Sequence, residues 1–340
     1  MAEHASAAAP ALAPAPLHCP YPERQQKAKQ GDSLDTVDKE SLFANYKSIL
    51  SRQFAVSLIV EFIGVMFFQI LGATAIKEWA WIVNGFALTV WIYTAANISG
   101  GHLNPAVTLS IFACGFFPLT HTLLYVALQV GGAILGAYVT STLVPGASVG
   151  MGDGGPGCFD RTVVGDGITD GNIFGWELVM TFTLISCVYA CGVAKPGHGS
   201  HTPLAVGLAL LCCAGAGGQY TGASLNPARV IGPLTIFACG KDVCWIYILG
   251  QVAAAALSCS VFAFVSGLGP LNPYTSSRTL HLEWHEAMFV WMTGSPPKRL
   301  RHTGRENVND MLLEEKKRRI AAKSASSGSG ARASGALGGA

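Results

Sequence analysis

Six long apolar segments, separated by shorter polar stretches, dominate the chain between residues 53 and 267. About 20 apolar residues cross a hydrocarbon core of about 30 Å. Open sheet edges cannot lie in lipid, so such segments are expected to be helices. They are rich in Gly, Ala, Ser and Thr, which let membrane helices approach closely, and Gly132 and Gly136 form one such pair. The pattern predicts six transmembrane helices, near 53–76, 79–97, 119–143, 173–194, 203–220 and 243–267.

Polar segments flank and divide this apolar region. Residues 1–51 are Ala/Pro-rich and then charged, and we predict a mobile tail without the apolar core of a signal peptide. A Gly-rich connection occupies residues 144–172. Residues 268–340 are predicted to form a basic, largely disordered tail, although "ENVNDMLLEEKKRRIAAK" within it could form a surface helix. The membrane domain is therefore expected at 52–267.

Two sequence segments in this domain are nearly alike: "SGGHLNPAVTLSIFACG" from Ser99 and "TGASLNPARVIGPLTIFACG" from Thr221. Asn104 and Asn226 are 122 positions apart. The same separation holds for Tyr125 and Tyr247, and for Gln129 and Gln251. The two halves, 52–143 and 173–267, thus hold three predicted spans each. An odd number of spans makes the second half enter the membrane from the opposite side, which predicts an inverted repeat.

Each of these two segments carries Asn-Pro-Ala before a short apolar run. Asn is a favoured N-cap and Pro a favoured first helical residue. The run of about ten residues would form a helix of about 15 Å, half a bilayer. Its polar start is tolerable only beside a water-filled path. We therefore predict an all-α membrane protein with six transmembrane helices and two half-membrane re-entrant helices. The predicted pore residues are Asn104, Pro105, Ala106, Asn226, Pro227 and Ala228.

Charge follows the same division. Only five of the 22 Lys and Arg residues lie between Arg52 and Arg278, as expected for a lipid-embedded region, because a charge at mid-bilayer costs at least about 2.5–3.5 kcal/mol. The tails and the loop 195–202 are basic, whereas the connection 144–172 is acidic. Both termini are therefore expected to face the cytoplasm, and membrane lipid is the expected surrounding.

Other chemistry has little support. The ten cysteines show no paired spacing typical of a disulfide framework or a zinc site, and Cys158 has no evident partner, so we assign them no chemistry. We find no metal-ligand cluster, nucleophile–base pair or phosphate-binding loop. The expectation is a protein that is not an enzyme and has no cofactor, metal or nucleic-acid partner.

The doubled Asn-Pro-Ala box and residues 52–267 resemble the aquaporin family, the major intrinsic proteins. The segments "ANISGGHLNPAVT" and "TGASLNPAR" are most similar to those of the plant tonoplast subgroup. The resemblance implies a passive channel for water, assembled as a homotetramer with one pore per subunit. A secondary transporter stays as the alternative, because inverted repeats with broken helices also serve that class. The sequence leaves open which membrane holds the protein: the vacuolar membrane, another internal membrane or the plasma membrane.

The resemblance also implies a selectivity filter. Arg229 in "NPAR" matches the constriction arginine of the family, and counting from the boxes without gaps places its other positions at Asn84, Ala214 and Ala223. These small side chains should widen the opening. We therefore expect passage of water and of small neutral solutes such as ammonia, urea or glycerol, with protons and ions excluded.

Two carboxylates and one histidine complete the candidates. Glu61 and Glu177 lie in predicted spans, where acids are proton-relay candidates. Their symmetric placement and the resemblance favour a structural role instead, as acceptors for the irregular backbone of the two re-entrant loops. His102, two residues before the first box, either faces a vestibule or is a packed, hydrogen-bonded histidine.

Overall fold

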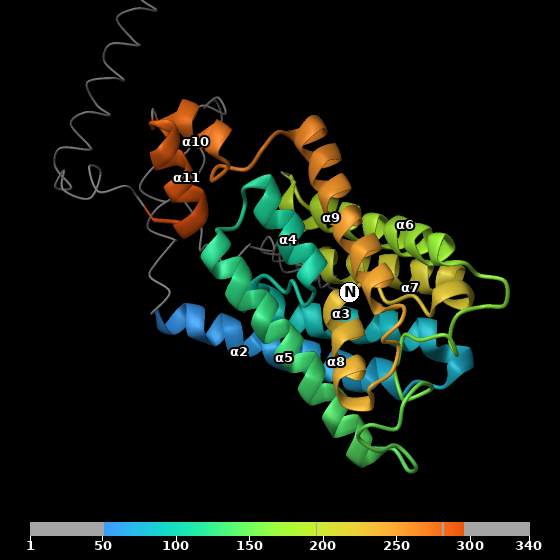
Figure 1. Cartoon of the computed structure of the whole chain (residues 1–340). Coiled ribbons are helices and arrows are strands. Elements are labelled where there is room, and N and C mark those ends of the chain that lie inside the picture. Colours follow the sequence, from blue (N-terminus) through green and yellow to red (C-terminus); the bar gives the residue numbers. More distant parts are fainter. Residues whose placement is uncertain (1–50, 195, 281, 296–340) are drawn as a thin grey trace, which may run out of the picture. The chain divides into compact units, whose positions relative to one another are not determined.

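The computed structural model describes residues 51–194, 196–280 and 282–295, and all regular structure in them is helical (Figure 1). The first half contains α2 (Arg52–Ala73), η1 (Lys77–Trp79), α3 (Ala80–Ser99), α4 (Pro105–Cys114) and α5 (Leu119–Leu143). The second half contains α6 (Asp170–Val188), η2 (Tyr189–Val193), η3 (Gly199–His201), α7 (Thr202–Thr221), α8 (Pro227–Phe237) and α9 (Cys244–Ser266). Two further helices follow, α10 (Pro273–Leu280) and α11 (Trp284–Thr293).

The six predicted spans are confirmed. Six of the described helices are long and apolar enough to cross a membrane, and their bounds differ from the predicted ones by only a few residues. Large apolar side chains on these helices point outward, with Ile59 and Val90 both more than half exposed. A soluble protein rarely exposes such a continuous apolar surface, whereas lipid covers it at no cost.

The inverted repeat is visible in the packing. Helix α2 packs on α5 in the first half, and α6 packs on α9 in the second. The halves meet where α3 crosses α7, with Gly85 against Gly207. Each half-length helix contacts the third span of the other half, α4 on α9 and α8 on α5. Figure 1 shows α4 and α8 as short helices within the bundle.

The predicted small-residue contact lies between α2 and α5. A Cβ on Gly132 would collide with the carbonyl oxygen of Phe62, and one on Gly136 with the carbonyl oxygen of Met66. Only glycine allows the two backbones to come this close. The pair therefore sets the separation of the first and third spans.

One end of the bundle, here called the tail face, holds the starts of α2 and α5 and the end of α9. The ring of Phe54 on α2 lies 4.2 Å from the ring of His121 on α5. After α9, the chain binds the end of α4, because the Gly269 amide donates to the Cys114 carbonyl at 2.7 Å. The opposite end, the loop face, holds the connecting loop 144–169.

The chain after α9 departs from the predicted disordered tail. Residues 273–280 and 284–293 form α10 and α11. The Trp291 indole stacks on Phe112 at 4.7 Å and donates a hydrogen bond to the Phe112 carbonyl. This aromatic contact orders a segment that composition alone assigns to solvent. Residues 1–50 of the predicted N-terminal tail (1–51) lie outside the described residues, as do residues 296–340 with the possible surface helix.

The prediction that the cysteines carry no chemistry is wrong for one pair. Cys158 and Cys239 form a disulfide across 81 residues of sequence. The connecting loop folds back onto the end of α8, where the amides of Gly150 and Gly152 donate to the carbonyls of Ile236 and Phe237. Local spacing could not reveal a pair that only this long-range fold brings together.

Candidate pore and selectivity filter

The two Asn-Pro-Ala boxes meet at the centre of the bundle. The Asn104 side-chain oxygen accepts from the Ala106 amide at 2.9 Å, and the Asn226 oxygen accepts from the Ala228 amide at 3.0 Å. Each asparagine thus caps its own half-helix, with proline as the first helical residue. With its oxygen held by the helix, each side chain directs its NH₂ group away from it.

These NH₂ groups cross between the halves. Asn104 Nδ2 donates to the Leu225 carbonyl and Asn226 Nδ2 to the Leu103 carbonyl, each at 2.8 Å. An amide nitrogen carries two hydrogens. One is used in this reciprocal bond, so the other can donate a hydrogen bond to a permeating molecule. The positive ends of α4 and α8 point at the same place.

The residues before each asparagine have a strained backbone. Leu103 and Leu225 have φ of 50° and 54°, in the left-handed region that leucine rarely adopts. Such a conformation costs about 1–3 kcal/mol and persists only where the surroundings enforce it. Here it turns each carbonyl toward the asparagine of the other half.

Glu61 holds the first loop in this shape. One carboxylate oxygen accepts from Ser99 Oγ at 2.7 Å and from the His102 amide at 2.9 Å. The other accepts from the Leu103 amide at 2.7 Å and from Gln129 Nε2 at 2.8 Å. An ionised carboxylate offers about four acceptor positions, and four donors occupy them.

Glu177 repeats the arrangement in the second half. One oxygen accepts from Thr221 Oγ1 at 2.9 Å and the Ser224 amide at 3.1 Å, and the other from the Leu225 amide at 2.9 Å and Gln251 Nε2 at 2.8 Å. Both carboxylates are fully buried. The matching sets of four donors favour the structural role over a proton relay, because each set includes the amides of the irregular backbone.

A narrow cavity of about 70 Å³ reaches both boxes. Asn104 and Asn226 line it together with His102, and it extends to Gly192 and Thr202 on the tail face. Most of the remaining lining residues are apolar, among them Phe68, Leu88, Ile92, Val107, Leu184 and Val206. A passage with few polar groups binds water weakly except where those groups converge, and here they converge at the two asparagines.

His102 unites the two alternatives left open by the sequence. It lines the cavity, but it is also buried and packed, with Nδ1 3.1 Å from Thr108 Oγ1. Its ring contacts those of Phe117 and Tyr125 at 5.2 and 5.4 Å. The imidazole is therefore a fixed wall of the cavity on the tail-face side of the boxes.

On the loop-face side, Arg229 and Asn84 converge. Arg229 is only 3% exposed, and its Nε and Nη1 have no hydrogen-bond partner among the described residues. Asn84 donates from Nδ2 to the Ala80 carbonyl, while its Oδ1 has no such partner. A Cβ on Gly72 would collide with both Asn84 Oδ1 and Arg229 Nη2, so the two polar ends lie beside the same glycine. Unpaired buried donors of this kind favour a polar guest.

The other two predicted filter positions carry only methyl groups. Ala223 is buried in the loop before the second box with φ of 54°, and its amide donates to Thr221 Oγ1. Ala214, on α7, is partly buried and packs against the apolar cluster that includes Ala223. Neither side chain adds a polar group or much volume.

Arg229 has two aromatic neighbours that its sequence pattern did not predict. Its guanidinium carbon lies 4.5 Å from the centre of the Phe68 ring and 5.7 Å from that of Phe159. Phe68 follows Glu61 by two helical turns, a spacing that could have revealed it. Phe159 lies in the connecting loop, where no periodic pattern predicts its position.

Comparisons with known proteins agree with this geometry. A family model described as "Major intrinsic protein" matches residues 41–262. Nodulin-26 from Glycine max is 33% identical over 68% of this chain and 85% of its own length. Probable aquaporin PIP1-5 from Arabidopsis thaliana is 32% identical over 70% and 89%, and Aquaporin-4 from Homo sapiens is 27% identical over 72% and 77%.

Among solved structures, the aquaglyceroporin from Plasmodium falciparum superposes with a TM-score of 0.52 at 24% identity, covering 62% of this chain and 95% of that one. At this identity the likeness concerns the fold. The inverted repeat, the paired boxes and the family match together place this chain in the major intrinsic protein family, as a passive membrane channel for water and small solutes and not an enzyme.

Proposed function

We propose that the passage runs between Asn104 and Asn226 and past Arg229, and that it carries water and small neutral solutes while excluding protons and ions. The observation that carries the proposal is the reciprocal bonding of the two amides. It leaves one N–H of each asparagine for a guest, at the point where two helix N-termini meet. Every other step of the mechanism depends on this pair.

At the boxes, a water molecule accepts hydrogen bonds from both amides through its oxygen. Its own hydrogens then point outward along the apolar passage, so it cannot accept a proton from either neighbour. A proton-conducting chain of waters is interrupted there. The positive ends of α4 and α8 repel cations at the same position.

At the filter, the Arg229 guanidinium donates to the oxygen of the permeant and adds to the cation barrier. Asn84 supplies an acceptor, through the oxygen that has no partner in the described structure. With methyl groups at Ala214 and Ala223, bulk at the filter is low. This supports passage of ammonia, urea or glycerol in addition to water.

We also infer the orientation and assembly. The basic tails and the loop 195–202 support a cytoplasmic position for both termini. The disulfide lies at the opposite, loop face, and disulfides persist in oxidising compartments outside the cytosol. Each chain encloses its own candidate passage, which is compatible with a homotetramer of independent pores in membrane lipid.

Stopped-flow measurements on proteoliposomes test the function. We expect proteoliposomes to change volume faster than empty vesicles in gradients of water, urea, glycerol and ammonia. The rate should be linear in the osmotic gradient. A pH-sensitive dye inside the vesicles should report no added proton leak. Flux that saturates with solute and follows an ion gradient would support a secondary transporter instead.

A further inference from the structure

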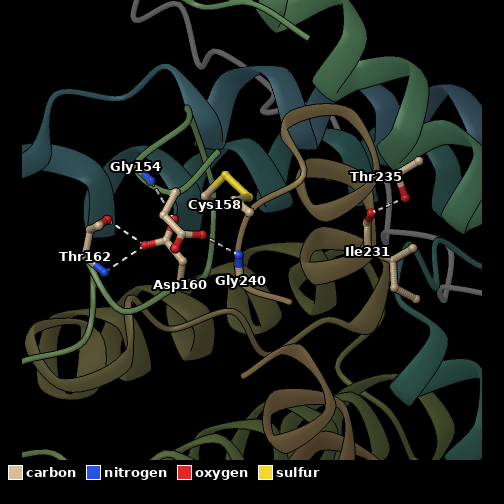
Figure 2. The surroundings of a disulfide bond; sticks show 9 residues. Gly154, Cys158, Asp160, Thr162, Ile231, Thr235 and Gly240 are labelled. Carbon is tan, nitrogen blue, oxygen red and sulfur yellow. Dashed lines mark hydrogen bonds between the residues drawn. A yellow bond between two sulfur atoms is a disulfide. The ribbon is translucent and has the colours of Figure 1, made fainter. Parts of the chain in front are cut away.

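The disulfide joins the connecting loop to the segment that follows α8, near Arg229. Cys158 and Cys239 are 3% and 1% exposed, and their Cα atoms are 6.1 Å apart. Figure 2 shows the bond beside Asp160 and Gly240. The next residue after Cys158 is Phe159, whose ring faces Arg229 at 5.7 Å.

Hydrogen bonds within the loop give its middle a defined shape. Asp160 is fully buried and accepts from the Gly154 amide at 2.7 Å and the Thr162 amide at 2.8 Å. The Cys158 amide donates to the Gly155 carbonyl at 3.0 Å. These bonds shape residues 154–162, and Figure 2 shows those of Asp160. Just before this segment, Asp153 Oδ1 accepts from the Gly240 amide at 2.8 Å, which links the loop to the chain after α8.

Ion pairs add little to the attachment of this segment to the channel. Arg161 pairs with Asp170 and Asp242, but its side chain is 44% exposed and both aspartates are 55% exposed. Exposed ion pairs of this kind contribute little. The disulfide is the one covalent tie between the segment and the end of α8 within the described residues.

The filter depends on where Phe159 lies. The Arg229 guanidinium lies over the rings of Phe68 and Phe159, while its Nε and Nη1 have no hydrogen-bond partner in the part of the chain that the structure describes. Its orientation therefore follows from the two rings more than from hydrogen bonds. Phe68 is fixed on α2 inside the core, but Phe159 is held by the loop and packs on Tyr247 at 5.6 Å.

We propose that the Cys158–Cys239 disulfide is a positioning element of the filter, which keeps Phe159 against Arg229 and thereby limits the entry of small neutral solutes. The proposal rests on the proposed passage beside Arg229. The two cysteines do not touch the permeant and act through Phe159.

Breaking the bond should widen the filter. A phosphine reductant cleaves the S–S bond and is oxidised to the phosphine oxide with oxygen from one water, whose two hydrogens complete the two thiols. The variant Cys158→Ala/Cys239→Ala removes the bond without a reductant. Cys244→Ala, at the start of α9 near the same face, is the matched control because Cys244 is a free cysteine.

The measurement is the ratio of urea permeability to water permeability in proteoliposomes. We expect the double variant and the reduced wild type to raise it about threefold, the scale of losing one cation–π contact, while Cys244→Ala leaves it unchanged. Phe159→Ala with the disulfide intact should give the same rise, and reduction should add nothing further. A lower melting temperature with an unchanged ratio would make the bond merely structural and overturn the proposal.

A second readout does not depend on transport. An arginine-selective dicarbonyl reagent, followed by mass spectrometry, measures the reactivity of Arg229 in the folded full-length protein. Reactivity should rise in the double variant and in Phe159→Ala. If proteoliposomes with the wild type show no added permeability but this rise in Arg229 reactivity occurs, the proposed passage is wrong, whereas the positioning of Phe159 by the disulfide is supported. If the reactivity of Arg229 is the same in the wild type and both variants, the proposal that the disulfide positions Phe159 against Arg229 is refuted.

Discussion

At the scale of residues, the chemistry is concentrated in a few buried polar groups with spare hydrogen-bonding capacity. The two box asparagines each keep one N–H, and within the described residues Arg229 Nε and Nη1 and Asn84 Oδ1 have no hydrogen-bond partner. Glu61 and Glu177, by contrast, use their oxygens to hold the backbone of the two re-entrant loops. The distinction separates groups that serve the permeant from groups that shape its path.

Asn84→Phe should narrow the filter, because a ring replaces the small amide beside Arg229. We expect urea and glycerol permeability to fall about tenfold, equivalent to about 1.4 kcal/mol of added barrier, with a smaller effect on water. Stopped-flow swelling checks this, with Asn97→Phe on the exposed side of α3 as control. An unchanged urea-to-water ratio would show that Asn84 lies outside the constriction.

Glu61→Gln and Glu177→Gln should destabilise the protein to similar extents. Each amide replaces an acceptor oxygen with an NH₂ group that faces two donors, and a buried unsatisfied group costs about 1–3 kcal/mol. Thermal unfolding in detergent measures the loss. A proton relay would instead show normal stability together with changed proton leak.

At the scale of elements, two kinds of close contact decide the architecture. Half-helices α4 and α8 are capped identically and each packs on the third span of the other half. Helices α2 and α5 approach through Gly132 and Gly136. Packing of this kind replaces the hydrophobic effect, which does not drive helix association in lipid.

Gly132→Ala should weaken the α2–α5 contact, because its Cβ would collide with the Phe62 carbonyl. Overpacking of this kind costs about 1–3 kcal/mol. Gly131→Ala is the matched control, since a Cβ there would lie 3.4 Å from the Phe62 ring, an ordinary contact. Equal melting temperatures for the two variants would contradict the proposed role of Gly132.

At the scale of the whole molecule, the channel domain extends beyond its six spans. The connecting loop is anchored to the end of α8 by the disulfide, and α11 is anchored to α4 by Trp291. Both attachments fix segments at the ends of the bundle, where composition predicts loops or solvated tails.

Trp291→Ala should release α11 from Phe112. The loss of one indole hydrogen bond and one aromatic stack should raise the fraction of molecules in which α11 is detached from Phe112 roughly tenfold. Limited proteolysis between residues 267 and 283 measures this, and swelling should be unaffected. Trp284→Ala, where the side chain is 62% exposed, serves as control. Equal cleavage rates in both variants would argue against the anchor.

The amino-acid sequence alone predicts the spans, the inverted repeat and the two boxes, because apolar length and helix capping are local properties and the second repeat supports the first. It also predicts Arg229, Asn84 and both glutamates as site residues, through their positions in the repeat and the resemblance. Three contacts appear only in the folded chain: the Cys158–Cys239 disulfide, the packing of Phe159 on Arg229 and the docking of Trp291 on Phe112. These contacts join residues far apart in the chain, where no periodic pattern records which surfaces will meet.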